Sequence, residues 1–153
     1  MELINMHSHT TYCGHAKNTM HDMIEAAANA GISAYAVTEH YPLYAPFDTW
    51  GYVSMPPYKV DDYLAEIEQH RAAHPEMQII AGVEVDWLGD FENRDFSQED
   101  WSRFDMVLGS IHYLDGWAFD DPSLIKAWDA MGVDDCWRRY FEVWCQCATS
   151  DGP

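Results

Sequence analysis

Basic residues are scarce in this 153-residue sequence: Lys and Arg total 8 against 26 Asp and Glu, and the formal net charge is −18. Nucleic-acid binding depends on Lys and Arg that neutralise phosphates, so the composition argues against a nucleic-acid partner. An acidic protein can still bind a phosphate ester when metal ions supply the positive charge. Small phosphate esters therefore remain candidate ligands.

Long apolar runs and paired cysteines are also missing. No apolar segment approaches the length of a membrane span, and the start of the chain lacks the basic and apolar regions of a secretory signal. We therefore expect no membrane partner and a cytoplasmic location. The four cysteines lack Cys-x-x-Cys spacing, which argues against a disulfide framework or a zinc knuckle. The length and a hydrophobic content of 48% predict one domain over residues 1–153.

The hydrophobic pattern alternates apolar strands with amphipathic helices. Strands are predicted at 3–6, 34–38, 78–83 and 106–111, of which the first is expected to be short and buried and the second to be covered on both faces. Helices are predicted at 19–30, where Thr19 and Asp22 form a cap, at 61–73, and at 133–148 along one apolar stripe, with a helical turn at 97–100. The aromatic loop 41–59 is either a functional lid or a segment packed onto its own domain. Four βα units in succession predict a parallel α/β architecture.

Metal-type side chains stand at the C-terminal ends of all four predicted strands: His7 and His9, then His40, then Glu84, then His112. Side chains alternate along a strand, so His7 and His9 point the same way about 6.5 Å apart. An isolated His-x-His pair is more often part of a polar loop. Since the C-terminal ends of parallel strands converge, however, the repetition favours a metal site.

A mixed set of imidazole and carboxylate ligands suits Zn, Mn or Fe(II) rather than Ca or Mg alone. A carboxylate such as Glu84 can bridge two ions. Water bound in such a cluster loses a proton near neutral pH and becomes a hydroxide nucleophile. Hydrolysis of a phosphate ester is the natural use of such a site.

The sequence resembles the PHP (polymerase and histidinol phosphatase) superfamily, and within it the PHP-type histidinol phosphatases. The matching blocks are His7-Ser8-His9-Thr10 with Cys13-Gly14-His15, Thr38-Glu39-His40, Gly82-Val83-Glu84-Val85-Asp86, and the run from Gly109 to Trp117. The resemblance implies a distorted (β/α)7 barrel, of which this chain supplies about the first four βα units. It also implies three divalent ions, Zn, Mn or Fe.

The resemblance further implies how the ligands are shared. His7 and His9 would hold the first ion, Glu84 would bridge it to a second ion bound by His112, and His15 and His40 would hold the third. The implied catalytic group is a metal-bound hydroxide held by His7, His9, Glu84 and His112. Two residues depart from the family pattern: Asn5 and Glu39 each stand where Asp is usual, in positions expected to support the ligands rather than to bind metal.

The implied activity is hydrolysis of L-histidinol phosphate to L-histidinol and phosphate in histidine biosynthesis. Asp86 would support a ligand or face the substrate, while Asp115 and Trp117 would either line the pocket for the substrate's amine and imidazole or belong to a packed loop. Two alternatives stay open: another PHP-type phosphodiesterase or exonuclease, and a metal-binding module without turnover, because the family's C-terminal ligands are absent. Unpaired strand edges also predict self-association.

Overall fold

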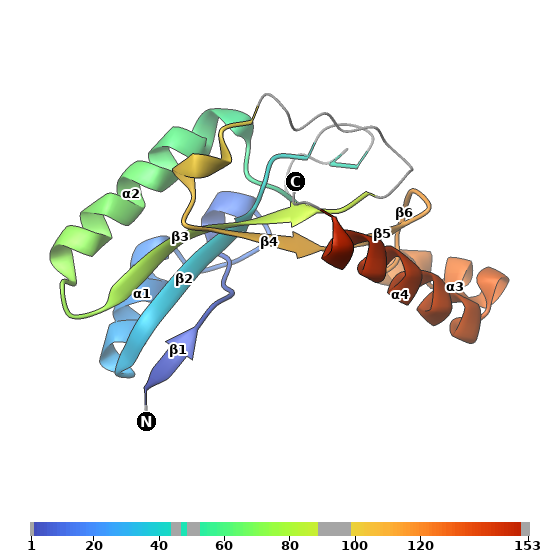
Figure 1. The fold of residues 1–153 in the computed structure, drawn as a ribbon, viewed down its shortest axis with the longest axis horizontal. Coiled ribbons are helices and arrows are strands. Elements are labelled where there is room, and N and C mark those ends of the chain that lie inside the picture. Colours follow the sequence, from blue (N-terminus) through green and yellow to red (C-terminus); the bar gives the residue numbers. More distant parts are fainter. Residues whose placement is uncertain (1, 44–46, 49–52, 89–98, 151–153) are drawn as a thin grey trace. The chain divides into compact units, whose positions relative to one another are not determined.

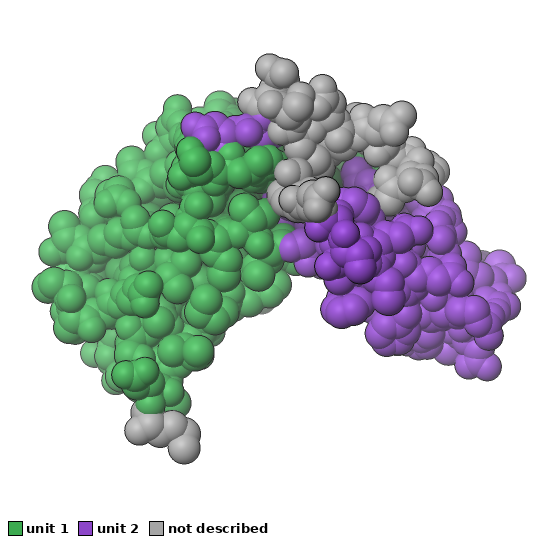
Figure 2. All heavy atoms as spheres, viewed as in Figure 1, with its two compact units in different colours: residues 1–84, 101–108 green, residues 85–100, 109–153 purple. Residues whose placement is uncertain are grey.

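The computed structural model describes residues 2–43, 47–48, 53–88 and 99–150 (Figure 1). The helices and strands are β1 (Leu3–Asn5), α1 (Met20–Asn29), β2 (Ile32–His40), α2 (Val60–Ala73), β3 (Gln78–Asp86), β4 (Met106–Ser110), β5 (Tyr113–Leu114), β6 (Trp117–Ala118), α3 (Ile125–Met131) and α4 (Val133–Thr149). Contacts divide the chain into two compact units (Figure 2): unit 1 is residues 1–84 and 101–108, and unit 2 is residues 85–100 and 109–153. None of the described helices has the length and apolar character of a membrane span.

The four predicted strands form one sheet in the order β1-β2-β3-β4. β2 lies parallel to both β1 and β3, and the arrows of β3 and β4 in Figure 1 run the same way. The register of β2 and β3 places His40 beside Glu84 and Thr38 beside Gly82. The predicted parallel α/β architecture is thereby confirmed.

The core of unit 1 lies between the sheet and the helices α1 and α2. The capping box of Thr19 and Asp22 starts α1 as predicted, and the chain leaves the helix through Gly31 at a φ of +73°. Tyr63 of α2 is fully buried, and its hydroxyl lies 2.8 Å from the Val37 carbonyl oxygen and 2.6 Å from that of Gly82. This contact ties α2 to β2 and β3 directly below the ends of these strands.

One predicted burial is wrong. The first strand was expected to be buried, yet Leu3 and Ile4 are 51% and 63% exposed, because in the described sheet β1 is an edge strand that pairs with β2 alone. The apolar stripe predicted along residues 133–148 is covered only in part within the described residues. Only Cys136 and Val143 on this helix are buried, while Trp137 and other large apolar side chains of the stripe are exposed.

Unit 2 contains a hairpin that the hydrophobic pattern did not predict. β5 and β6 pair antiparallel, and Asp115 and Gly116 between them have φ values of 48° and 88°. Positive φ at both central residues is the requirement of a two-residue I′ turn, for which Asp-Gly is a favoured pair. α3 was also not predicted.

The aromatic loop 41–59 is only partly described. Tyr41 and Phe47 are buried, as the packed alternative expects, and Tyr58 is 77% exposed. Residues 44–46 and 49–52 of this loop, and residues 97–98 of the expected turn 97–100, lie outside the described residues.

Candidate metal site

Unit 1 brings His7, His9, His15, His40 and Glu84 together at the C-terminal ends of β1, β2 and β3. Glu84 is buried, and its Oε2 lies 3.0 Å from Nε2 of His7, 3.0 Å from Nε2 of His9 and 3.5 Å from Nδ1 of His40. One carboxylate oxygen is therefore the common neighbour of three imidazoles. The metal roles of these residues stay predictions.

The geometry of His7, His9 and Glu84 fits a divalent ion. Their two Nε2 atoms are also 3.0 Å apart, so the three ligand atoms form a triangle with equal edges. Ligand bonds of about 2.1 Å at right angles place neighbouring donors about 3.0 Å apart, the spacing of two histidines and a carboxylate on one face of an octahedral ion. Neutral imidazoles cannot supply a proton to every edge of this triangle, whereas a cation would be bound by all three lone pairs.

A second group of possible ligands consists of His9, His15 and His40, whose nearest ring nitrogens lie within 4.8 Å of one another. The ring centroids of His9 and His40 are stacked 4.5 Å apart, and that of His15 lies 5.4 Å from His9 and 5.2 Å from His40. Gly14, at a φ of +77°, ends the turn that returns His15 to the cluster.

The segment that carries His7 and His9 is fixed to β2 through Ser8. Its hydroxyl donates to the Ala36 carbonyl at 2.7 Å, and its backbone N–H donates to Thr38 Oγ1 at 3.0 Å. The Thr38 hydroxyl in turn donates to the Ser8 carbonyl at 3.1 Å. These bonds determine where the two histidines project. The small polar residue within His-Ser-His was the available sequence signal, and its role was not predicted.

Glu39 is the carboxylate whose contacts could not be inferred from the sequence. It is fully buried, and its Oε1 accepts from the backbone N–H and the hydroxyl of Thr10 at 2.7 and 2.6 Å. Burial raises its pKa above the usual value for Glu, while the bonds from Thr10 oppose this rise. The signal in the sequence was an acid within an otherwise apolar strand, because a buried carboxylate needs partners.

His9, Cys13 and Glu39 form a further group that satisfies the distance requirement for metal ligands. The pKa of the Cys13 thiol is raised to about 12, first by burial and then by the charge of Glu39. The thiol also lies 3.2 Å from the Thr10 carbonyl, to which it donates. Because a metal binds the thiolate, this environment favours a structural thiol.

The remaining predicted site residues lie in unit 2. Nδ1 of His112 lies 2.6 Å from the buried Asp86 carboxylate and 3.3 Å from Ser110 Oγ. Asp86 is thus placed to orient His112, which agrees with the ligand-supporting alternative. Asp115 is already paired with Arg139, whose Nε lies 3.1 Å from Oδ1. Trp117 packs edge-to-face with the indole of Trp128. These contacts agree with the packed-loop alternative, and substrate contact by Asp115 and Trp117 stays a prediction.

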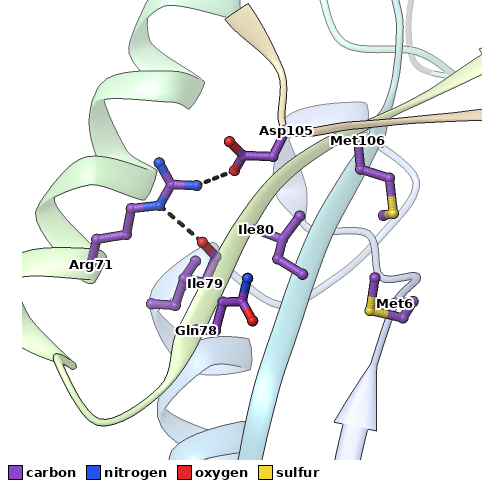
Figure 3. A pocket seen from close by; sticks show the side chains of 7 residues that line it. All are labelled: Met6, Arg71, Gln78, Ile79, Ile80, Asp105 and Met106. Atoms are coloured by element: carbon purple, nitrogen blue, oxygen red, sulfur yellow. Dashed lines mark hydrogen bonds and ion pairs between the residues drawn. The ribbon is translucent and has the colours of Figure 1, made fainter.

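A cavity of about 520 Å³ lies elsewhere in unit 1 (Figure 3). Its lining consists of Met6, Arg71, Gln78, Ile79, Ile80, Asp105 and Met106, none of which is a predicted metal ligand. Arg71 donates to the Ile79 carbonyl at 2.9 Å, and its guanidinium pairs with Asp105 and Glu68. Since this cation is already engaged by carboxylates, the cavity is a poor phosphate site.

The fold and the candidate site together define the class of protein. It is an α/β protein in which histidine and carboxylate side chains form a possible metal site at the carboxyl ends of parallel strands. The PHP domain family model matches residues 5–153, so the chain belongs to the PHP domain family. The predicted resemblance is confirmed, and the parallel sheet with its helices is part of the PHP-type distorted barrel. Possible His and Glu ligand groups agree with the metal dependence of this family.

The chain is similar to two curated proteins and to one solved structure that are named as histidinol phosphatases. The chain is 31% identical over 148 residues to a probable histidinol-phosphatase of Deinococcus radiodurans, covering 92% of this chain and 54% of that protein. It is 24% identical to a probable histidinol-phosphatase of Clostridium acetobutylicum, covering 95% and 52%. A solved structure from Listeria monocytogenes, assigned by name to the histidinol phosphatases, aligns with a TM-score of 0.64 at 25% identity, covering 72% and 45%. The chain spans about half the length of the curated relatives it matches.

Proposed function

We propose that this chain is the metal-binding part of a PHP-type phosphatase that hydrolyses L-histidinol phosphate to L-histidinol and phosphate. The observation that carries the proposal is the triangle of His7, His9 and Glu84, with ligand atoms 3.0 Å apart. The names of the relatives support the substrate. The same proposal includes a place in histidine biosynthesis in the cytoplasm.

In this proposal three divalent ions, Zn, Mn or Fe, are shared as the resemblance implies. His7, His9 and Glu84 hold the first, Glu84 and His112 contribute to the second, and His15 and His40 hold the third. When bound, such ions neutralise phosphate oxygens and lower the pKa of water towards neutrality. The protein needs that positive charge, because its own net charge is −18.

The residues of the chain orient the histidine side chains and hold the proton of His112 on one ring nitrogen. Buried Glu84 keeps its Oε2 within 3.5 Å of three imidazoles, which limits how far each ring can turn. Ser8 and Thr38 fix the backbone between His7 and His9. Asp86 accepts from or shares a proton with His112 Nδ1, which leaves Nε2 of that ring with its lone pair for a ligand bond.

The test compares metal content and turnover in the same samples. The chain is stripped with a chelator, reloaded with Zn, Mn or Fe, and assayed for phosphate release from histidinol phosphate and from a phosphodiester dinucleotide. We expect metal uptake and preferential release from the monoester, both lost in His7→Ala/His9→Ala. His21→Ala is the matched control, because it removes an exposed histidine of α1 outside the cluster.

Each contrary outcome has a distinct meaning. Preferential cleavage of the dinucleotide would replace the monoesterase by the phosphodiesterase alternative. Metal uptake without turnover of either substrate would support the non-catalytic metal-binding module. No uptake of any of the three metals, or equal uptake by the double variant, would refute the site itself.

A further inference from the structure

Glu39 and His9 approach each other through two buried atoms, and no hydrogen bond joins these atoms in the structure. Nδ1 of His9 and Oε2 of Glu39 are both buried, neither has a partner at hydrogen-bond distance, and they lie 4.0 Å apart. The Cys13 thiol also faces this carboxylate, and it donates to the Thr10 carbonyl at 3.2 Å. A hydrogen bond between a ring N–H and a carboxylate is about 2.8 Å long, so a small turn of the ring would close the contact. An unpaired buried carboxylate oxygen is costly, which makes a donor at this position favourable.

The other oxygen of Glu39 cannot exchange roles with Oε2. Oε1 accepts two donors of Thr10, its backbone N–H and its hydroxyl, at 2.7 and 2.6 Å. The carboxylate is therefore held with Oε2 towards His9. On the opposite side of the ring, Nε2 of His9 lies 3.0 Å from Oε2 of Glu84, within the ligand triangle.

We propose that Glu39 is a positioning residue that keeps the proton of His9 on Nδ1, so that Nε2 presents its lone pair to the metal ion. This inference rests on the proposed function and deepens it. A neutral imidazole carries one proton, and the partner of one ring nitrogen decides which nitrogen is free to bind metal. The carboxylate of Glu39 accepts the proton-bearing nitrogen, and Thr10 keeps that carboxylate in place.

The variant Glu39→Gln tests the inference because it replaces the acceptor that faces Nδ1 of His9 by a donor. Thr10 requires an acceptor, so the amide oxygen takes the place of Oε1 and the amide NH2 faces Nδ1 of His9. A donor at this position favours the tautomer with the proton on Nε2, which is the wrong form for the metal. Glu39→Asp keeps both carboxylate oxygens and is the conservative variant. Glu66→Gln is the matched control, since Glu66 accepts from Tyr12 at 2.7 Å outside the cluster.

The first readout is the tautomer of His9 in the metal-free protein, measured by long-range ¹H–¹⁵N NMR with His9→Gln for assignment. We expect the proton on Nδ1 in the wild type, Glu39→Asp and Glu66→Gln, and on Nε2 in Glu39→Gln. The second readout is Zn or Mn affinity, which should fall about 10- to 100-fold in Glu39→Gln alone.

A proton on Nε2 of His9 in the wild type would overturn the inference, whether or not the variants fold. An unchanged tautomer in folded Glu39→Gln would overturn it as well, even if its metal affinity fell. Failure of the proposed function looks different: the wild type would bind no metal, while the tautomer would still respond to Glu39→Gln. That result would uphold the contact between Glu39 and His9.

Discussion

Replacing Gly82 by alanine should destabilise the sheet and disturb the metal site together. A Cβ at this position would lie 2.6 Å from Thr38 Cγ2, 2.9 Å from the Val37 carbonyl oxygen and 3.3 Å from Met106 Cε. The carbonyl is backbone and cannot move alone. Thr38 cannot turn away freely either, because its hydroxyl is bonded to the N–H and the carbonyl of Ser8 at 3.0 and 3.1 Å.

Two opposing contributions decide whether Gly82→Ala raises or lowers the free energy of unfolding. Overpacking a close-packed site costs about 1–3 kcal/mol. Replacing glycine by alanine also stabilises the folded state by about 0.4–1 kcal/mol, because it lowers the conformational entropy of the unfolded chain. We therefore expect Gly82→Ala to lower the free energy of unfolding by about 1–2 kcal/mol, measured by urea titration. Because Ser8 lies between His7 and His9, the same variant should lower metal uptake.

Gly31→Ala separates this steric effect from the general effect of adding a methyl group. A Cβ at Gly31 meets nothing within 4 Å, but the φ of +73° is unfavourable for alanine. That strain costs about 1 kcal/mol and should leave metal uptake unchanged. The reasoning is refuted if Gly82→Ala is as stable as the wild type, or if its metal uptake falls no more than that of Gly31→Ala.

Three further predictions use other parts of the chain. If His15 and His40 serve one ion, removing either should cause a similar loss of phosphate release in a full-length relative carrying both, and a double-mutant cycle should show non-additive losses; additive losses would assign them to separate sites. Iodoacetamide at pH 8 should modify exposed Cys145 and spare Cys13, whose thiol is buried with a pKa of about 12, and peptide mass spectrometry reports the difference. The exposed edge strand should promote self-association, so Ile4→Lys should lower the sedimentation-derived mass at high protein concentration, and a wild type that is monomeric throughout would contradict this.

The convergence of the site residues could be predicted because it depends only on strand direction. Parallel strands bring their carboxyl ends to one edge, whatever the details of packing. The register adds what the sequence could not specify. His40 pairs with Glu84 across β2 and β3, and a slip by one residue would turn one of these side chains to the other face.

Burial was predicted less well, because an apolar pattern identifies a face but not its neighbour. Leu3 and Ile4 are both apolar, yet both side chains are exposed, because β1 has a neighbouring strand on one edge only in the described sheet. On α4 the apolar surface is wider than the part that packs, so Val143 is buried while Phe141 is 58% exposed. The β5–β6 hairpin was missed although its Asp115-Gly116 turn is a recognised sequence signal, since strands of two residues carry almost no periodicity.

The buried carboxylates of Glu39 and Glu84 lie on opposite sides of the His9 ring. Glu39 is 4.0 Å from Nδ1, and Glu84 is 3.0 Å from Nε2. A neutral ring has one proton and so can satisfy only one of them. The inference assigns this proton to Nδ1 and Glu39, so that the lone pair of Nε2 faces Oε2 of Glu84 until a cation in the triangle is bound by both atoms. Metal uptake and closure of the Glu39–His9 contact are therefore coupled, and each should strengthen the other. This coupling arises from residues on β2, β3 and the segment after β1, which explains why no single motif in the sequence reveals it.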